Sequence, residues 1–198
     1  MLMRTLALAL ALAAPAAFAA LETGKPAPDF TATDSHGKLV KLSQFKGKTV
    51  VLEWTNAQCP FVKKHYSGGN MQSLQKAATQ DGAVWLSVIS SAPGKEGHVD
   101  GAGANHLTND RRAHPTHVLL DESGTVGRLY DAKTTPHMFV VNTDGTLVYQ
   151  GGIDSNPSAD PADITGATPF VKLALAETKA GKKVTQATTR PYGCSIKY

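Results

Sequence analysis

The order of predicted strands and helices places this chain in the α/β class. A short apolar run at 50–54 is rich in β-branched and aromatic residues, which is typical of a buried strand. A second run at 84–89 is apolar nearly throughout, as expected for a parallel strand that is covered on both faces. The turn Thr143-Asp144-Gly145 separates two further apolar runs and predicts an antiparallel hairpin. We therefore expect a mixed β-sheet, part parallel and part antiparallel, with helices on both faces.

Residues 1–19 have the pattern of a secretory signal peptide. Arg4 supplies a basic start, 6–14 is an apolar run, and Ala17-Phe18-Ala19 is a small-residue cleavage signal. The apolar run is too short for a spanning helix, and no later stretch of the sequence is apolar enough to cross a bilayer. We expect an exported protein of about 180 residues without membrane insertion, periplasmic if the host has two membranes. A retained membrane anchor is the alternative.

Residues 20–181 are expected to form one domain, and its first half begins with a β-hairpin. The turn Ser35-His36-Gly37-Lys38 separates the two strands of this hairpin. Ser43 is suited to cap a single helical turn. Pro60 begins a helix, because the N–H that proline lacks would have no partner in the first turn. The expected segments are strands at 28–34, 39–42 and 48–54, a helical turn at 43–45, and helices at 59–66 and 71–78.

The second half continues the alternation of strands and helices and ends in a tail. A polar loop at 90–103 is expected to border the functional site, because ligands approach open α/β sheets at the carboxyl ends of strands. The final helix is amphipathic and stops at Gly181. Residues 182–198 are expected to form an extended, flexible tail that carries Cys194. The expected segments are strands at 84–89, 117–121, 138–142 and 146–150, and helices at 104–113 and 169–180.

Charge and cysteine content narrow the classes of function. The formal net charge is +4, and the basic residues are scattered, without the basic block of a nucleic-acid-binding protein. We therefore expect no nucleic-acid partner. The chain contains two cysteines, Cys59 and Cys194. In an oxidising compartment this pair has only one intramolecular disulfide available to it.

The sequence around Cys59 favours a reactive thiolate. The cysteine is predicted where a central strand is followed by a helix N-terminus, so free backbone N–H groups and the positive end of the helix dipole face the sulfur. Lys63 is expected over the same helical face, where it would add positive charge. The alternative is an inert buried thiol, since buried structural cysteines are common.

Three motifs, informative through their order and spacing, resemble a known superfamily. The first is the lead-in Gly24-Lys25-Pro26-Ala27-Pro28-Asp29-Phe30, followed by Leu42-Ser43-Gln44-Phe45-Lys46-Gly47-Lys48. The second is Cys59-Pro60 at a strand-to-helix turn, and the third is Thr135-Pro136 before a strand-turn-strand. Together they resemble the thioredoxin-like superfamily, in its exported redoxin branch of peroxiredoxin-type (AhpC/TSA-like) and thiol-disulfide oxidoreductase (TlpA-like) domains. The resemblance spans roughly 24–180 and implies a thioredoxin-like fold with an N-terminal hairpin extension.

Some positions around Cys59 differ from the motifs of that superfamily, and these differences bear on which mechanism is expected. Thioredoxins have a second cysteine three residues after the first, where this chain has Val62. Peroxiredoxins have Thr or Ser three residues before the cysteine and Pro seven before it, where this chain has Asn56 and Leu52. Glu53, six residues before Cys59, matches the buried acid that assists proton transfer in thioredoxins. The resemblance therefore favours a thioredoxin-like mechanism over a peroxidase.

The resemblance also implies roles for individual residues. It makes Cys59 the expected nucleophile. Independently of the resemblance, the tail is long enough to reach across the domain, so Cys194 is the expected resolving cysteine, with a permanent structural bridge as the alternative. A cis Pro136 would hold the Thr135 backbone beside Cys59, ready to pair with a substrate chain, whereas an ordinary trans proline is the alternative. Burial would raise the pKa of Glu53 and suit it to proton transfer, and a salt bridge to a lysine is the alternative.

Three hypotheses of function follow. The first is an exported thiol-disulfide oxidoreductase without a cofactor, whose partners are protein or small-molecule thiols and disulfides. The second is a thiol peroxidase that acts on peroxides, in which Cys59 becomes a sulfenic acid and Cys194 condenses with it. The third is a copper- or zinc-binding protein with Cys59, His65 and His137 as ligands, although the spacing turns His65 to a different helical face from Cys59.

Overall fold

The computed structural model describes residues 21–198, so the signal peptide expected at 1–19 lies outside the described residues. Within 21–198, seven strands form one sheet in the order β2-β1-β5-β4-β3-β7-β8, and β6 pairs separately with β9. The strands are β1 (Thr31–Asp34), β2 (Leu39–Lys41), β3 (Val50–Trp54), β4 (Val84–Ile89), β5 (His117–Leu120), β6 (Thr134–Thr135), β7 (His137–Val141), β8 (Leu147–Gly151) and β9 (Cys194–Ser195). The helices are α1 (Pro60–Ser67), α2 (Asn70–Gln80), α3 (Gly101–Asp110), α4 (Thr125–Leu129) and α5 (Phe170–Lys179), with 3-10 turns η1 (Leu42–Phe45) and η2 (Pro161–Ile164).

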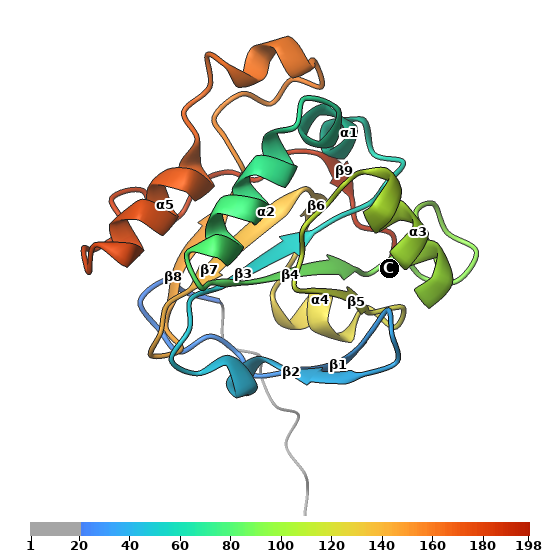
Figure 1. Ribbon diagram of the computed structural model, residues 1–198, viewed down its shortest axis with the longest axis horizontal. Helices are drawn as coiled ribbons and strands as arrows, with labels where there is room; N and C mark the ends of the chain where they lie inside the picture. Colours follow the sequence, from blue (N-terminus) through green and yellow to red (C-terminus); the bar gives the residue numbers. More distant parts are fainter. Residues whose placement is uncertain (1–20) are drawn as a thin grey trace, which may run out of the picture.

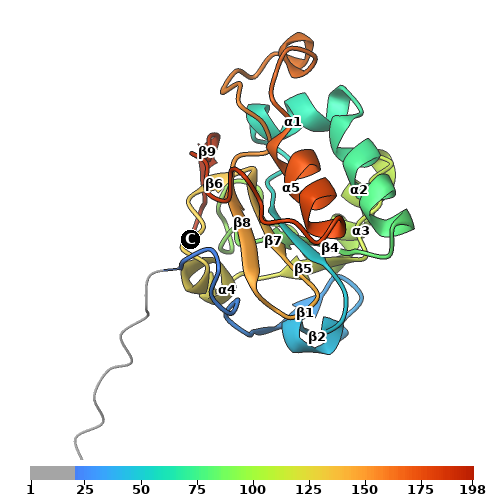
Figure 2. The same cartoon turned by 90° about the vertical axis from the view of Figure 1, so that its left-hand side faces the viewer.

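The middle of the large sheet is parallel and its flanks are antiparallel. β4 pairs in parallel with both β3 and β5, whereas β7 and β8 continue the sheet antiparallel on one side and β1 and β2 on the other. Helices α1, α2 and α5 cover one face, and α4 lies on the opposite face (Figure 1 and Figure 2). The predicted α/β class, with a mixed sheet and helices on both faces, is confirmed.

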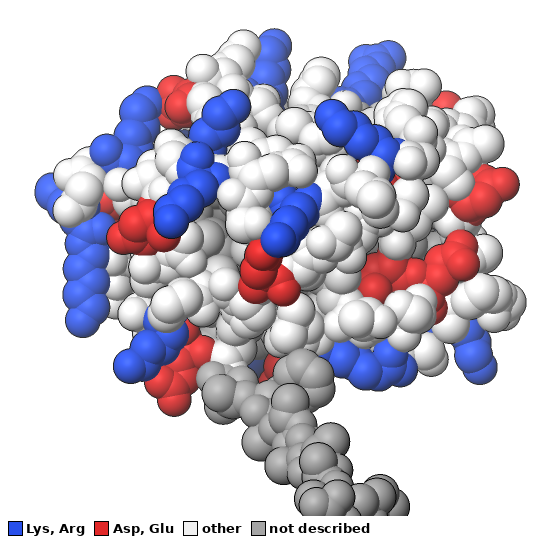
Figure 3. Space-filling model, turned by 90° about the horizontal axis from the view of Figure 1, so that it is seen from below, with Lys and Arg blue, Asp and Glu red and all other residues white. Residues whose placement is uncertain are grey.

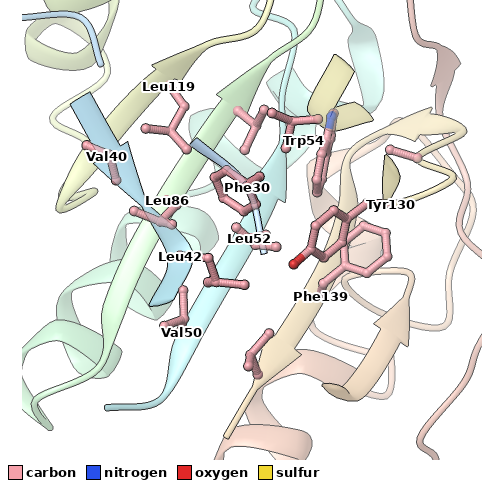
Figure 4. Packing of buried hydrophobic residues seen from close by; sticks show 14 of the residues in the cluster. Phe30, Val40, Leu42, Val50, Leu52, Trp54, Leu86, Leu119, Tyr130 and Phe139 are labelled. Atoms are coloured by element: carbon pink, nitrogen blue, oxygen red, sulfur yellow. The ribbon is translucent and has the colours of Figure 1, made fainter. Parts of the chain in front are cut away.

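Strand β3 divides the core between the two faces of the sheet, because successive side chains of a strand point to opposite sides. Leu52 and Trp54 pack on the α4 face with Phe30, Tyr130 and Phe139 (Figure 4). The ring centroids of Trp54 and Phe139 are 5.1 Å apart in an edge-on arrangement, which is favourable for aromatic pairs. The intervening residues of β3 therefore point into the layer beneath α1 and α2.

That second layer holds the residues on which the function was predicted to depend. Glu53 and Cys59 are both fully buried, and Cys59 is part of the hydrophobic cluster beneath α1 and α2. The other fully or nearly fully buried members of this cluster include Val51, Val62, Met71, Trp85, Met138, Val140, Tyr149 and Val171. The predicted active-site region is thus built into the core and not onto a surface loop.

Two helices differ from the sequence predictions because of side-chain caps. The helix expected at 104–113 begins at Gly101, since the Asp100 side chain accepts a 2.8 Å hydrogen bond from the Gly103 N–H. Segment 126–130 is not among the expected helices, yet α4 forms there. The buried Asp121 side chain accepts hydrogen bonds from the N–H groups of Val126 and Gly127, at 3.0 and 2.8 Å, and so fixes the first turn of α4.

The expectation of a flexible C-terminal tail is wrong. The tail runs along β8, where the Thr189 N–H donates to the Gln150 carbonyl oxygen at 3.0 Å, and then pairs through β9 with β6. Near its end, the Lys197 carbonyl oxygen accepts a 2.8 Å hydrogen bond from the Ala92 N–H. These partners are far away in the sequence, so the local pattern of residues 182–198 contains no sign of them.

The surface shows mixed charge. On the face seen in Figure 3, Lys and Arg side chains are interspersed with Asp and Glu side chains. Among residues 21–198, no helix is long and apolar enough to cross a membrane.

Candidate functional site

Cys59 lies where the sequence predicted it, between β3 and α1. It is the N-cap residue of α1, and Pro60 occupies the first helical position. Its carbonyl oxygen accepts hydrogen bonds from the N–H groups of Val62 and Lys63, at 3.1 and 2.9 Å, which begin the helix. The sulfur therefore lies at the positive end of the helix dipole, which stabilises a thiolate relative to a thiol.

The two cysteines of the chain form a disulfide. Cys59 and Cys194 are 135 positions apart in sequence, and their Cα atoms are 5.9 Å apart. Cys59 is 0% exposed to solvent, whereas Cys194 is partly exposed. The predicted pairing is confirmed, and Cys194 is the more exposed residue of the two.

The Thr135-Pro136 peptide bond is cis, as the resemblance to the thioredoxin-like superfamily implied. The Thr135 carbonyl oxygen lies 3.1 Å from the Cys59 sulfur. Thr135 is also the residue directly opposite Cys194 in the antiparallel pairing of β6 with β9. The structure thus brings Cys59, Cys194 and Thr135 together, and the place where a substrate backbone was expected is taken by the protein's own tail.

Glu53 is buried as expected, and no residue that the structure describes forms a salt bridge with it. Among the described residues, its carboxylate accepts hydrogen bonds from the side chains of Tyr66 (2.8 Å), Gln75 (3.0 Å), Trp85 (2.8 Å) and Ser87 (3.0 Å). Burial raises the pKa of Glu53, and these four donors partly oppose the rise. Cys59 is not one of the donors, so the structure shows no direct hydrogen bond for the predicted proton transfer.

The two lysines of α1 differ in burial. Lys63 is exposed, whereas its neighbour Lys64 is almost fully buried. The Lys64 ammonium donates a 2.9 Å hydrogen bond to the Asn156 carbonyl oxygen and lies 3.8 Å from the Asp154 carboxylate. The helix turns Lys63 outward and directs Lys64 toward the loop that follows β8.

A buried polar cluster beside the disulfide escaped the sequence analysis. Asp154, which is 3% exposed, accepts hydrogen bonds from the Tyr192 hydroxyl at 2.5 Å and from the Asn156 N–H at 3.0 Å. The same hydroxyl lies 3.1 Å from Nε2 of His65. Burial lowers the pKa of His65 to about 4, although Asp154 acts in the opposite direction. Tyr192 stands two residues before Cys194 in an extended tail. That spacing is the feature of the sequence that could have indicated that Tyr192 lies near the disulfide.

The three residues proposed as metal ligands do not form a set. Cys59 is in the disulfide, and His65 is hydrogen-bonded within the polar cluster just described. His137 accepts a 3.2 Å hydrogen bond from the Lys133 N–H through Nδ1, and its ring centroid is 4.4 Å from that of Phe139. In the described part of the chain, no group of three or more His, Cys, Asp or Glu side chains is placed to hold a metal ion.

Comparison with solved structures places the fold among known ones. A conserved protein from Geobacillus kaustophilus is 25% identical, with a TM-score of 0.79, over 89% of this chain and 92% of that one. A hypothetical protein from Sinorhizobium meliloti 1021 is 21% identical, with a TM-score of 0.75, over 91% of this chain and 96% of that one. The likeness to both extends over about nine-tenths of the chain.

Comparison with curated sequences finds a relative of known activity. The thiol-disulfide oxidoreductase ResA of Bacillus thuringiensis subsp. konkukian is 26% identical over 130 residues, which is 66% of this chain and 69% of that protein. The Redoxin family model matches residues 22–167, a range that includes Cys59, Glu53 and the cis-proline. The chain therefore belongs to the Redoxin family and has the thioredoxin-like fold of its thiol-disulfide oxidoreductase members.

Proposed function

We propose that this protein is an exported thiol-disulfide oxidoreductase whose Cys59 and Cys194 alternate between a dithiol and a disulfide. The observation that carries the proposal is the bridge itself. It joins a helix-capping cysteine beside a cis-proline to a partly exposed cysteine on a tail held by a two-residue strand. The similarity to ResA supports the same activity.

In the reducing direction, the Cys59 thiolate attacks one sulfur of a substrate disulfide, and the other substrate sulfur leaves as a thiolate. The Cys194 thiolate then attacks Cys59 in the mixed disulfide, which releases the second substrate thiolate and forms the Cys59–Cys194 bridge. The protein loses two electrons and the substrate gains two. Run backwards, the same steps oxidise a dithiol.

Reduction of the bridge begins at Cys194. Cys59 is fully buried, so an external thiolate reaches the partly exposed Cys194 and forms a mixed disulfide with it. The Cys59 sulfur is the leaving group. Its position at the N-terminus of α1 stabilises the thiolate that departs, which makes it a good leaving group.

Export is the second part of the proposal, and it rests on residues 1–19. Their basic start, apolar run and small-residue cleavage signal are those of a signal peptide. Cell fractionation and sequencing of the mature N-terminus test this part. We expect a mature protein that begins at Ala20 outside the inner membrane, and an unprocessed N-terminus would contradict it.

The experiment that tests the activity is a redox titration of the mature protein against defined thiol-disulfide buffers, read by mass spectrometry after alkylation. We expect Cys59 and Cys194 to be oxidised and reduced together at a moderately oxidising potential. In a matched pair of variants, reduced Cys194→Ser should form a mixed disulfide with a model disulfide, and Cys59→Ser should react no faster than a free thiol. A bridge that resists all but the strongest reductants would identify a structural staple and overturn the proposal.

A further inference from the structure

The tail passes Cys59 between β6, Phe61 of α1 and Arg128 of α4, and we call the path that it follows the groove. Strand β9 pairs antiparallel with β6, with Thr134 opposite Ser195 and Thr135 opposite Cys194. The two short strands lie side by side next to the N-terminal end of α1 in both views of the molecule (Figure 1 and Figure 2). Beyond the pair, the Ile196 N–H donates to the Lys133 carbonyl oxygen at 3.3 Å. The backbone of the tail is therefore held in an extended form from Cys194 to Ile196.

At position 193, directly before Cys194, there is no space for a side chain. Gly193 has a φ of 139°, a conformation that residues with a side chain rarely adopt. A Cβ atom at this position would collide with the carbonyl oxygen of Thr135. The restriction comes from Thr135, so it applies to any chain that places its cysteine on Cys59 in this direction and register.

Two residues before Cys194, the groove holds an aromatic ring. The Tyr192 ring packs edge-on against Phe61, with centroids 5.9 Å apart, and the Lys64 ammonium lies 5.5 Å from its centroid. Its hydroxyl donates a hydrogen bond to the buried Asp154. Within residues 21–198, the nearest cationic side chain to Asp154 is Lys64, at 3.8 Å. Next to this position, a cavity of about 580 Å³ is lined by Phe61, Phe170, Pro157, Pro191 and other residues of the tail and its surroundings.

Four residues after Cys194, a second aromatic ring is fitted between the tail and α4. The Tyr198 hydroxyl donates a 2.9 Å hydrogen bond to the Ala132 carbonyl oxygen, and the Arg128 guanidinium lies 4.5 Å from the ring centroid. A Cβ atom on either Gly124 or Gly127 would collide with this ring. Glycine at 124 and 127 therefore leaves the space that the Tyr198 ring occupies.

We propose that the tail is an internal copy of the substrate, and that the groove selects extended polypeptide segments with the pattern aromatic-Gly-Cys. This inference rests on the proposed function and names its substrate class: cystine-containing proteins. Once the bridge is reduced, the tail is held only by non-covalent contacts. A partner segment then displaces it and pairs with Thr135. The Cys59 thiolate attacks the segment's cysteine sulfur, and the sulfur that was bonded to it leaves as a thiolate.

The test uses the full mature chain with Cys194→Ser, in the reduced state. The probe is a peptide with the sequence of residues 190–198, Arg-Pro-Tyr-Gly-Cys-Ser-Ile-Lys-Tyr, whose cysteine is joined by a disulfide to 2-nitro-5-thiobenzoate. Attack by Cys59 releases this coloured thiolate and leaves the peptide on Cys59, which mass spectrometry confirms. Matched probes carry Gly193→Ala or Tyr192→Ala, and a scrambled peptide of the same composition is the control.

We expect the peptide with Gly193→Ala to react about tenfold more slowly than the native sequence, and the scrambled peptide to be slower still. If all peptides react equally and far faster than with a free thiol, the selection of aromatic-Gly-Cys is refuted while the proposed oxidoreductase function stands. If none reacts faster than with a free thiol, the function itself is refuted, and the inference with it.

Discussion

The Tyr192 hydroxyl donates a 2.5 Å hydrogen bond to Oδ1 of Asp154, a carboxylate that is almost completely buried. This contact joins the tail to the loop after β8, two residues before the cysteine that forms the disulfide. A hydrogen bond to a buried charged group contributes more than a neutral one, and leaving such a group without a partner is costly. The pair therefore helps to hold Cys194 against Cys59.

Removal of this hydroxyl should weaken the disulfide. We expect Tyr192→Phe to lower the equilibrium constant for closing the Cys59–Cys194 bridge against glutathione by about tenfold. The matched control is Tyr198→Phe, which removes a neutral hydrogen bond on the other side of Cys194 and should cost about threefold. Both constants follow from the fractions of oxidised protein in glutathione buffers. Equal effects of the two variants would contradict a special contribution from Asp154.

Substitution of the buried acid tests the predicted proton transfer to Cys59. Glu53→Gln keeps one oxygen, the amide carbonyl, which can accept hydrogen bonds from the Trp85 and Ser87 side chains. The new amide NH2 can donate to the Tyr66 hydroxyl, which rotates to accept this hydrogen bond. We expect a folded protein whose Cys59 reacts about 3- to 10-fold more slowly and whose pH–rate profile has lost one ionisation. Rates are measured with a model disulfide between pH 5 and 9. An unchanged pH–rate profile would show that Glu53 has only a structural role, as a hydrogen-bond acceptor that links β3 to its neighbours.

Acid should destabilise the fold before the carboxylates on its surface are protonated. Burial lowers the pKa of both His65 and His137 to about 4, from an ordinary value of 6.5. Between pH 6.5 and 4, these two histidines are protonated in the unfolded chain but not in the folded one. Their contribution to the free energy of unfolding is therefore fully present above about pH 6.5 and is lost as the pH falls toward 4. We expect a loss on the order of 1–3 kcal/mol per histidine, measured by urea unfolding.

The control for this pH effect is His137→Asn, which keeps an acceptor for the Lys133 N–H but cannot titrate. It should reduce the loss of stability between pH 6.5 and 4 by about half, if the two histidines contribute equally. A pH dependence identical to that of the unaltered protein would assign the effect to other groups.

Peroxide should be a poor substrate of the reduced protein. Asn56 stands where the resemblance to peroxiredoxins requires Thr or Ser, and its side chain is already engaged: it accepts from the Gln58 N–H at 2.8 Å and donates to the Glu96 carbonyl oxygen at 3.3 Å. We expect hydrogen peroxide to oxidise the reduced protein no faster than a free thiol, as measured by competition with a thiol probe. A stoichiometric burst of peroxide consumption would instead support the peroxidase hypothesis.

Local patterns in the sequence were sufficient for much of the fold and for the centre of the site. The apolar runs at 50–54 and 84–89 became β3 and β4, and proline in the first turn located the start of α1 directly after Cys59. These features depend on strand period and on helix-end chemistry, which act over a few residues. The cis bond before Pro136 was expected for a different reason, the resemblance of Thr135-Pro136 to a motif of the thioredoxin-like superfamily.

Only the tertiary structure decided how the tail is used. Which lysine of α1 points inward, the partners of Glu53, and the Tyr192–Asp154 contact all depend on residues that lie far apart in the chain. A flexible tail was expected because its sequence has no strand or helix period, yet its backbone finds donors and acceptors on β6, β8 and the loop at Ala92. The sequence by itself determined the position of Cys59 and of the helix that follows it, because these depend on local chemistry. Folding determined what lies over that cysteine, because such contacts form only when distant segments meet.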